Sequence, residues 1–387
     1  MLSRARILLL NGYHVLIDGL FDAAPILLTF AALAFGAGEE AVGIIVSLCT
    51  AVGTVAGLGT VFLSRTLGFV RTLGLVTVAS GAGYCAAAFS GGMVSAGACF
   101  VLALAGFAVF HNIAFSYLTQ NTERRRVGRV LSDFTAIGDI GRIPFASLAA
   151  FAAGGAYTWL PGWRGVCFIY GAATLAAALW LFFRFPREAP AARASARPGG
   201  SFPAFALLKD RELFLVMLAN VLNAFSAERV FTFLPLLLIA KGMDPDVIAS
   251  FALGFSLGSF FGKVACGRFV DRFGTRRVFV AAQMLLTVLL CVLIAADSLA
   301  GIIGIALLLG IVTKGAVPVI QAIITEPVDP ARCDDVFSIS SFLRGVINTV
   351  TPLLFGFMAS AWGMQTGYAL MAAGAFASVI PVFLLRR

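Results

Sequence analysis

The stretch Gly267-Arg268-Phe269-Val270-Asp271-Arg272-Phe273-Gly274-Thr275-Arg276-Arg277 places one acid among four bases, with a glycine at its start and another near its end. On both sides the chain is apolar, over roughly 246–269 and 276–296. A helix of about 20 apolar residues, rising about 1.5 Å per residue, crosses the roughly 30 Å hydrocarbon core of a bilayer. Because glycine lets the backbone turn between closely packed elements, the stretch predicts a tight charged turn between two membrane-spanning helices.

The same apolar pattern recurs along the whole chain. Of the 387 residues 60% are hydrophobic and only 12% are charged, whereas about a quarter of the residues of a soluble domain are charged. The alternating segments of about ten residues that indicate a membrane barrel are absent. We therefore predict an all-α polytopic membrane protein of twelve transmembrane helices. Their expected positions are roughly 7–35, 41–63, 70–90, 93–119, 127–153, 164–185, 212–239, 246–269, 276–296, 298–325, 334–360 and 363–385.

The basic residues indicate how these helices are oriented. If the N-terminus lies in the cytoplasm, most of the 28 Lys and Arg fall in cytoplasmic segments, and only Arg164 and Lys241 lie in loops on the other side. The positive-inside rule then predicts cytoplasmic N- and C-termini, in a bacterial-type inner membrane. The net charge of +9 is explained by these topology anchors, so no nucleic-acid partner is expected.

A segment rich in Pro, Ala, Gly and Arg at 186–211 predicts a flexible cytoplasmic linker. It would separate an N-terminal six-helix bundle at 1–185 from a C-terminal six-helix bundle at 212–387. The two halves look like parallel repeats, because Pro25 falls opposite Pro235 and, in the same register, Asp18 falls opposite Glu228. We therefore expect two pseudo-symmetric halves.

The turn at 267–277 resembles the signature loop of the major facilitator superfamily of secondary transporters, in which an acid pairs with bases to latch one conformation. This resemblance implies alternating access between the two halves, with gating roles for Gly267, Asp271, Arg272 and Gly274. The equivalent loop, Thr60 to Arg71, is degenerate. It has Ser64-Arg65 where the family has Asp-Arg, and Gly68 stands one position out of register. A weaker latch is therefore expected there, with Arg65 as its remaining gating candidate.

Helix one carries the densest set of ionisable residues at membrane depth. His14, Asp18 and Asp22 are spaced i, i+4 and i+8, with Asn11 three residues before His14, so all four lie along one helical face. Ionisable side chains are costly in contact with lipid, so this face should point toward other helices or a cavity. Carboxylates removed from water beside one another bind protons more readily, which predicts proton coupling at Asp18 and Asp22. A structural hydrogen-bond network is the alternative.

His111 lies at a similar depth on helix four. The superfamily resemblance places helices one and four on the central cavity, so His14 and His111 could meet there and bind substrate, a proton or a metal-bearing ligand. Two histidines without a third clear ligand do not predict a metal site, and we expect no bound metal. On helix one, the His and Asp pair before a proline resembles bacterial exporters of the fosmidomycin-resistance type, which implies export.

On helix five, Asp139 and Arg142 are spaced i, i+3, which predicts an intrahelical ion pair near mid-membrane. The pair is consistent with a purely structural role. Its place on a helix that the resemblance puts at the cavity makes both residues substrate-binding candidates, with Arg142 suited to an anionic group.

The second half has its own buried charges. Glu228 and Arg229 are adjacent in the middle of helix seven and point about 100° apart, so at least one of them should reach another helix or the cavity. We expect Glu228 to handle protons as the counterpart of Asp18. Arg229, Lys314 and Arg344 are expected to pair with it or to contact substrate.

These features predict a proton-coupled secondary transporter, an antiporter that exports a small polar organic molecule such as a drug, a siderophore or a metabolite. The proton gradient would supply the energy, without a cofactor, and the protein would act as a monomer in the lipid bilayer. A proton-symport importer of an organic anion is the first alternative, and a non-transporting receptor or scaffold is the second. An enzyme is not expected, because the sequence has no Walker loop and no HExxH motif.

Overall fold

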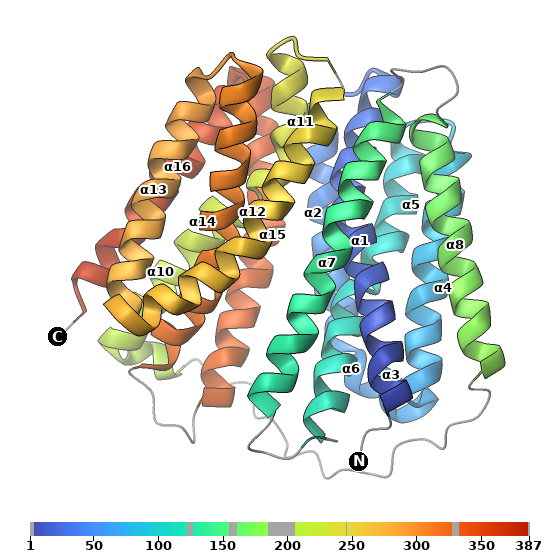
Figure 1. The fold of residues 1–387 in the computed structure, drawn as a ribbon, viewed down its shortest axis with the longest axis horizontal. Helices are drawn as coiled ribbons and strands as arrows, with labels where there is room; N and C mark the ends of the chain where they lie inside the picture. The colour runs from blue at the N-terminus through green and yellow to red at the C-terminus, as the bar shows by residue number, and fades with distance from the viewer. Residues whose placement is uncertain are drawn as a thin grey trace. The chain divides into compact units, whose positions relative to one another are not determined.

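A computed structural model describes residues 4–120, 122, 127–154, 161–184, 206–244, 246–326 and 333–385, and these form helices joined by short turns (Figure 1). The contacts divide the chain into two compact units, Met1–Ala196 and Arg197–Arg387. The first unit contains α1 (Arg4–Phe35), α2 (Glu39–Leu58), α3 (Thr60–Leu67), α4 (Phe69–Ala88), α5 (Met93–Ala105), α6 (Phe107–Gln120), α7 (Val127–Ala153) and α8 (Gly162–Arg184). The second contains η2 (Ala206–Lys209), α10 (Arg211–Ala227), α11 (Val230–Ala240), α12 (Asp246–Phe273), α13 (Thr275–Ala295), α14 (Leu299–Thr325), α15 (Cys333–Trp362) and α16 (Met364–Phe383).

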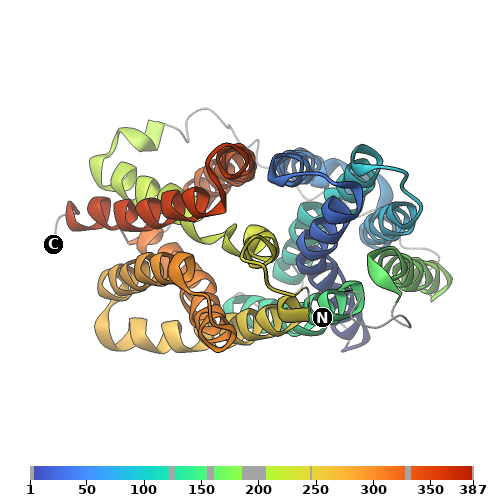
Figure 2. The ribbon, with the colours of Figure 1, turned by 90° about the horizontal axis from the view of Figure 1, so that it is seen from above.

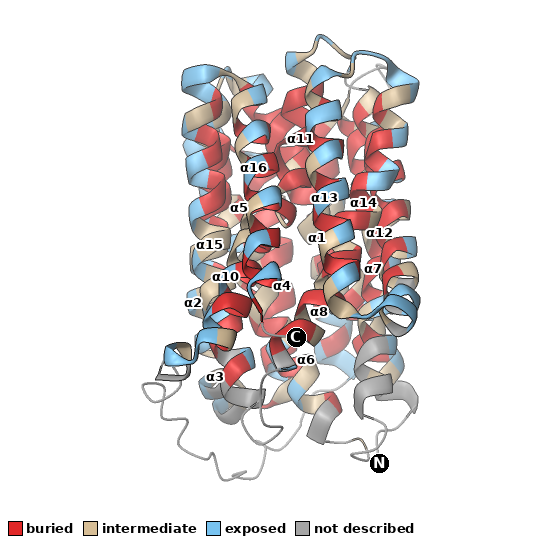
Figure 3. Ribbon diagram, turned by 90° about the vertical axis from the view of Figure 1, so that its left-hand side faces the viewer, coloured by how far each residue is buried: buried red, intermediate tan, exposed pale blue. Residues whose placement is uncertain are grey.

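Within the described residues, 12 segments are long and apolar enough to cross a membrane, six in each unit. This confirms the predicted fold class. Large apolar side chains such as Leu58, Val94 and Phe183 are exposed, whereas His14 and Asp18 are buried. Figure 3 shows that single helices, α13 and α16 among them, present one exposed and one buried side. Each unit thus turns apolar side chains toward lipid and shields its charges, as a membrane bundle must.

The helices of each unit run side by side, as Figures 1 and 2 show, and three neighbour pairs recur in both units. In the first unit α1 packs on α7, α2 on α5 and α4 on α8. In the second unit the corresponding pairs are α10 with α15, α12 with α14 and α13 with α16. The repeat inferred from the sequence is therefore also a repeat of helix contacts.

Glycines in the left-handed backbone region mark the same repeat. Gly68 and Gly274 both have φ of +82° and directly precede α4 and α13, and Gly36 and Gly242 form a second such pair. A residue with a Cβ is strained at these angles, which explains the glycines. Because Gly68 and Gly274 are structurally equivalent, the expected one-residue displacement of Gly68 is wrong. Arg65, and not Ser64, corresponds to Asp271.

Three predicted spans are interrupted. The second breaks at Gly59, the fourth at Gly106, and the seventh at Glu228 and Arg229, where α10 ends and α11 begins. Glu228 was expected in mid-helix but lies at a helix break. Hydrophobicity does not reveal such breaks, because both flanking segments stay apolar.

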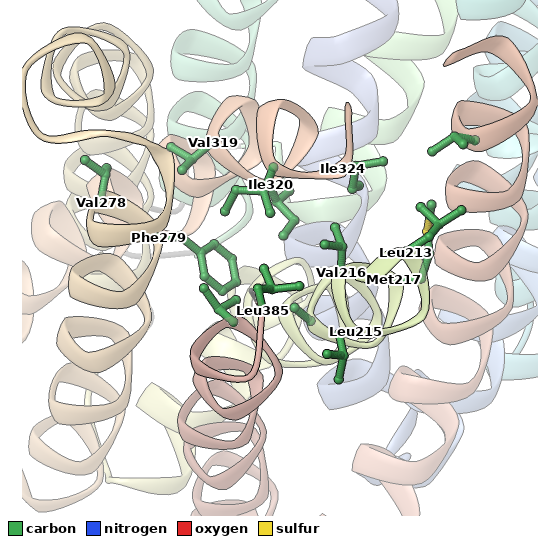
Figure 4. Close-up of a cluster of buried hydrophobic side chains, with 14 of the residues drawn as sticks. Leu213, Leu215, Val216, Met217, Val278, Phe279, Val319, Ile320, Ile324 and Leu385 are labelled. Atoms are coloured by element: carbon green, nitrogen blue, oxygen red, sulfur yellow. The ribbon is translucent and has the colours of Figure 1, made fainter. Parts of the chain in front are cut away.

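The predicted linker at 186–211 falls largely outside the described residues. Its last part is helical at η2, and Asp210 caps α10 by accepting a hydrogen bond from the Leu213 N–H at 3.0 Å. Nearby, Leu213, Val216, Phe279 and Ile320 belong to a buried apolar cluster that ties α10 to α13 and α14 (Figure 4). This cluster fixes the start of the span that carries Glu228.

Small residues allow α12 and α14 to pack closely. A methyl group on Gly258 would lie 2.0 Å from the Leu307 carbonyl oxygen, and one on Gly310 would lie 2.1 Å from that of Phe255. Membrane helices commonly approach through such small residues, since apolar side chains gain little by leaving lipid. This close packing holds α14, which carries Lys314, against α12.

Candidate functional site

The first unit contains a buried cluster of charged and histidine side chains from α1, α6 and α7. Helix α1 presents His14, Asp18 and Asp22 on one face, which packs against α7. Two glycines of α7 permit this close approach. A methyl group on Gly141 would lie 2.2 Å from the Val15 carbonyl oxygen, and Gly138 lies directly against His14 and Asp18. The α7 side chains can therefore reach across to the acids of α1.

Arg142 of α7 is the centre of an ion-pair network. Its Nε and Nη2 donate to Asp18 Oδ2 at 3.1 and 2.9 Å, and its Nη1 donates to Asp22 Oδ1 at 3.1 Å. The predicted pair with Asp139 is present too, with 3.3 Å between Arg142 Nε and Asp139 Oδ1. One guanidinium thus contacts three carboxylates. It can do so because its planar group presents several N–H donors in different directions.

His14 and His111 meet in the same cluster. Their Nε2 atoms lie 3.2 Å apart, and each is close to the Asp18 carboxylate, at 3.3 Å from His14 and 3.2 Å from His111. The Nδ1 atoms face backbone carbonyls at 2.9 Å, that of Phe134 for His14 and that of Phe107 for His111. The His14 ring also stacks on the Phe134 ring, with 4.0 Å between centroids. Both imidazoles are therefore fixed in position and in tautomer.

Substituting Gly138 by alanine is expected to disrupt this cluster. The added methyl group would lie 2.5 Å from His14 Nε2 and 2.8 Å from Asp18 Oδ2, and His14 cannot withdraw because it is stacked and hydrogen-bonded. Overpacking of this kind costs about 1–3 kcal/mol, so the unfolding temperature in detergent should fall. Gly12→Ala, on α1 with nothing within 4 Å, is the matched control. Equal effects of the two substitutions would contradict the close packing.

The second unit has a smaller cluster around Glu228. Arg344 of α15 donates through Nε to Glu228 Oε1 at 2.8 Å, and its Nη2 lies 2.6 Å from the same oxygen. Asn348, one turn further along α15, donates to Glu228 Oε2 at 2.5 Å. Arg229 and Lys314 also act electrostatically on this carboxylate. The helix break at Glu228 turns its side chain toward α15, the counterpart of α7.

The other candidates divide into two groups. Asn11 is half-buried and lies outside the contacts just described. The side chains of Asp271 and Arg65 fall outside the described residues, as does the burial of Gly267, although Asp271 lies in the last turn of α12. Arg272 is exposed, with its guanidinium carbon 5.2 Å from the Phe273 ring centroid.

The sequence did not reveal three residues that the structure places in these sites. Asn348 supports Glu228, Phe134 supports His14, and Glu326 holds the signature loop. Glu326 accepts a hydrogen bond from the Thr275 hydroxyl, and its Oε2 lies 3.6 Å from Arg276 Nε. Asn348 lies four residues after Arg344, a helical spacing that could have identified it.

Comparison with known proteins agrees with this architecture. Residues 14–254 and 216–387 match the sequence model of the Major Facilitator Superfamily. The chain belongs to this superfamily. As a member of the Major Facilitator Superfamily, it is a multi-pass membrane transporter. This is the superfamily that the signature loop indicated.

One curated relative is a chloramphenicol resistance protein of Streptomyces lividans, 31% identical over 189 residues. The match covers 48% of this chain and only 45% of that protein, so it spans about half the length of this relative.

Solved structures of superfamily transporters share the fold. The nucleoside transporter NupG has a TM-score of 0.80 at 11% identity, covering 98% of this chain and 100% of that one. The D-xylose-proton symporter has a TM-score of 0.78 at 12% identity, covering 100% and 98%. A bacterial homologue of the human lysosomal transporter Spinster, solved in an inward-facing conformation, has a TM-score of 0.69 at 16% identity, covering 99% and 96%. At these identities the likeness concerns the fold alone.

Proposed function

We propose that this chain is a proton-coupled exporter of a small polar organic molecule, acting in a bacterial-type inner membrane with both termini in the cytoplasm. One observation carries the proposal: each unit has a carboxylate bound by an arginine from the helix packed beside it, fully buried at Asp18 and partly buried at Glu228. Asp18 is bound by Arg142, and Glu228 is bound by Arg344. The two pairs lie on corresponding helices of the repeat, α1 with α7 and α10 with α15.

A carboxylate bound by an arginine at membrane depth is suited to proton coupling. Ionised, it satisfies the arginine; protonated, it is neutral, and the arginine loses its partner in a medium where a lone charge costs several kcal/mol. Proton binding therefore forces the guanidinium toward another anion or toward water. Loading a proton on Glu228 would release Arg344 in this way and change the packing of α10 and α15.

The composition of the clusters bears on the substrate. In the first unit three carboxylates surround one guanidinium, whereas in the second one carboxylate faces Arg344, Arg229 and Lys314. Because each cluster contains both carboxylate acceptors and cationic donors, each favours a polar molecule with groups of both kinds over a simple ion. The resistance function of the Streptomyces lividans relative supports export of such a molecule, since a transporter most simply confers resistance by removing a drug.

Inverted membrane vesicles test the proposal. With an imposed pH gradient, acid inside, vesicles containing the protein should accumulate members of a drug and metabolite panel, chloramphenicol included, and a protonophore should abolish this. Accumulation that ignores the pH gradient would exclude proton coupling. Accumulation only in right-side-out vesicles, under an inward proton gradient, would instead identify a symport importer.

A further inference from the structure

Three groups with lone pairs converge in the first unit: Nε2 of His14, Nε2 of His111 and the carboxylate of Asp18, with one ligand atom of each within 4.8 Å of the others. The two Nε2 atoms lie 3.2 Å apart, His111 Nε2 lies 3.2 Å from Asp18 Oδ1, and His14 Nε2 lies 3.3 Å from Asp18 Oδ2. His14 and Asp18 are 1% and 2% exposed, so water does not separate these groups from one another.

Proton placement makes this convergence unfavourable without a cation. Each Nδ1 faces a backbone carbonyl, which can only accept, so each Nδ1 carries the hydrogen of the neutral ring. Both Nε2 atoms are then acceptors pointing at each other and at a carboxylate. Asp18 Oδ1 takes no well-aligned hydrogen bond from the described residues. Buried acceptors without donors cost free energy, so the arrangement calls for a bound positive ion.

The spacing and the charge favour a metal ion over a proton. Ligand atoms about 2.0–2.1 Å from a tetrahedral metal lie about 3.3 Å from one another. The 3.2 Å between the two Nε2 atoms and the 3.2 Å between His111 Nε2 and Asp18 Oδ1 are close to this value. A proton can bridge only one pair of the three atoms, whereas a metal ion contacts all three. The cluster also holds three carboxylates against one guanidinium, an excess of two negative charges that a divalent cation would neutralise.

The surroundings match those of a metal site. Histidine ligands of metals usually donate their other ring N–H to a carbonyl or carboxylate, as the Phe134 and Phe107 carbonyls permit here. Arg142 holds the Asp18 carboxylate from its other oxygen, Oδ2. Two imidazoles with one carboxylate suit borderline divalent ions such as Zn²⁺, Co²⁺ and Ni²⁺.

We infer that His14, His111 and Asp18 form a binding site for one divalent first-row transition-metal ion. Three protein ligands leave a fourth coordination position, which a chelating group of a transported molecule can fill. The site extends the proposed function by naming a chemical class of cargo, the chelate of a metal ion. It does not depend on the direction of transport or on proton coupling.

Cobalt binding to purified protein tests the inference. Titration of the metal-free protein in detergent with Co²⁺ should give one equivalent of binding and the visible absorption bands of tetrahedral cobalt, and Zn²⁺ should displace it. Absence of binding, or binding without these bands, would overturn the proposal and leave a proton as the ion of this cluster. The readout does not involve transport, so it stands or falls separately from the proposed function.

His111 is the position at which to vary the site, because it is partly exposed and its replacement leaves His14 in place. His111→Ala should weaken Co²⁺ binding by at least about tenfold, the range lost when even a supporting residue is removed. His111→Cys should restore binding and add a thiolate-to-cobalt charge-transfer band, which only direct ligation produces. Glu228→Gln in the other unit should leave Co²⁺ binding unchanged. Unchanged affinity in His111→Ala would refute the assignment, and unfolding temperatures identify any variant that fails to fold.

Discussion

Replacing Glu228 by glutamine is expected to abolish accumulation driven by a pH gradient. Glutamine keeps the size of the side chain but does not ionise, so it neither takes up a proton nor forms the ion pair with Arg344. Active accumulation in inverted vesicles should fall to the level of vesicles that lack the protein. Exchange of labelled for unlabelled substrate without a gradient should persist, because exchange needs no net proton movement.

Glu212→Gln is the matched control for this variant. Both variants replace a glutamate of the same span by glutamine. Glu212 lies at the start of α10, where it pairs with the exposed Arg211. Gradient-driven accumulation should be retained in this control. If Glu228→Gln accumulates substrate as well as the parent protein does, Glu228 is a structural residue and not the proton carrier of the second unit.

Replacing Arg142 by alanine is expected to have the largest effect on stability. Arg142 contacts Asp18, Asp22 and Asp139, and its removal leaves three carboxylates close together without a compensating charge. Breaking a buried ion pair on one side costs about 3–5 kcal/mol. The yield of folded protein and its unfolding temperature in detergent should both fall sharply.

Two further variants test whether the loss of stability comes from the missing charge or from the missing hydrogen bonds of Arg142. Arg142→Lys keeps the charge but loses the planar fork, so its stability should lie between those of the parent and the alanine variant. Arg211→Ala removes an exposed arginine whose pair with Glu212 is worth about 0–1 kcal/mol, so its stability should stay near that of the parent. An Arg142→Ala protein as stable as Arg211→Ala would mean that the three carboxylates do not depend on the guanidinium.

Much of the fold was predictable because the properties that decide it are local. Apolar runs long enough to cross a bilayer set the twelve spans, and the turn at 267–277 indicated the superfamily that the family match then established. The face of α1 with His14, Asp18 and Asp22 follows from helical spacing alone. In each case the signal lies within one or two turns of helix.

The breaks within spans were not predictable. At Glu228 the backbone leaves the helix although the residues on both sides are apolar, so hydropathy gives no sign of it. The equivalence of Gly68 and Gly274 likewise depends on backbone angles and not on the neighbouring residue types. The sequence therefore aligned Ser64, and not Arg65, with Asp271.

The sequence by itself determined which helices cross the membrane and which of them carry charge, because hydrophobicity and helical period are properties of neighbouring residues. Only the tertiary structure decided the partners of these charges. His14 and His111 are 97 residues apart, and Arg142 and Asp22 are 120 residues apart. Arg142 reaches Asp22 because Gly138 and Gly141 let α7 approach α1 within side-chain reach. The packing of α6 beside α1 brings His111 to His14 and Asp18, which no spacing along one helix could show.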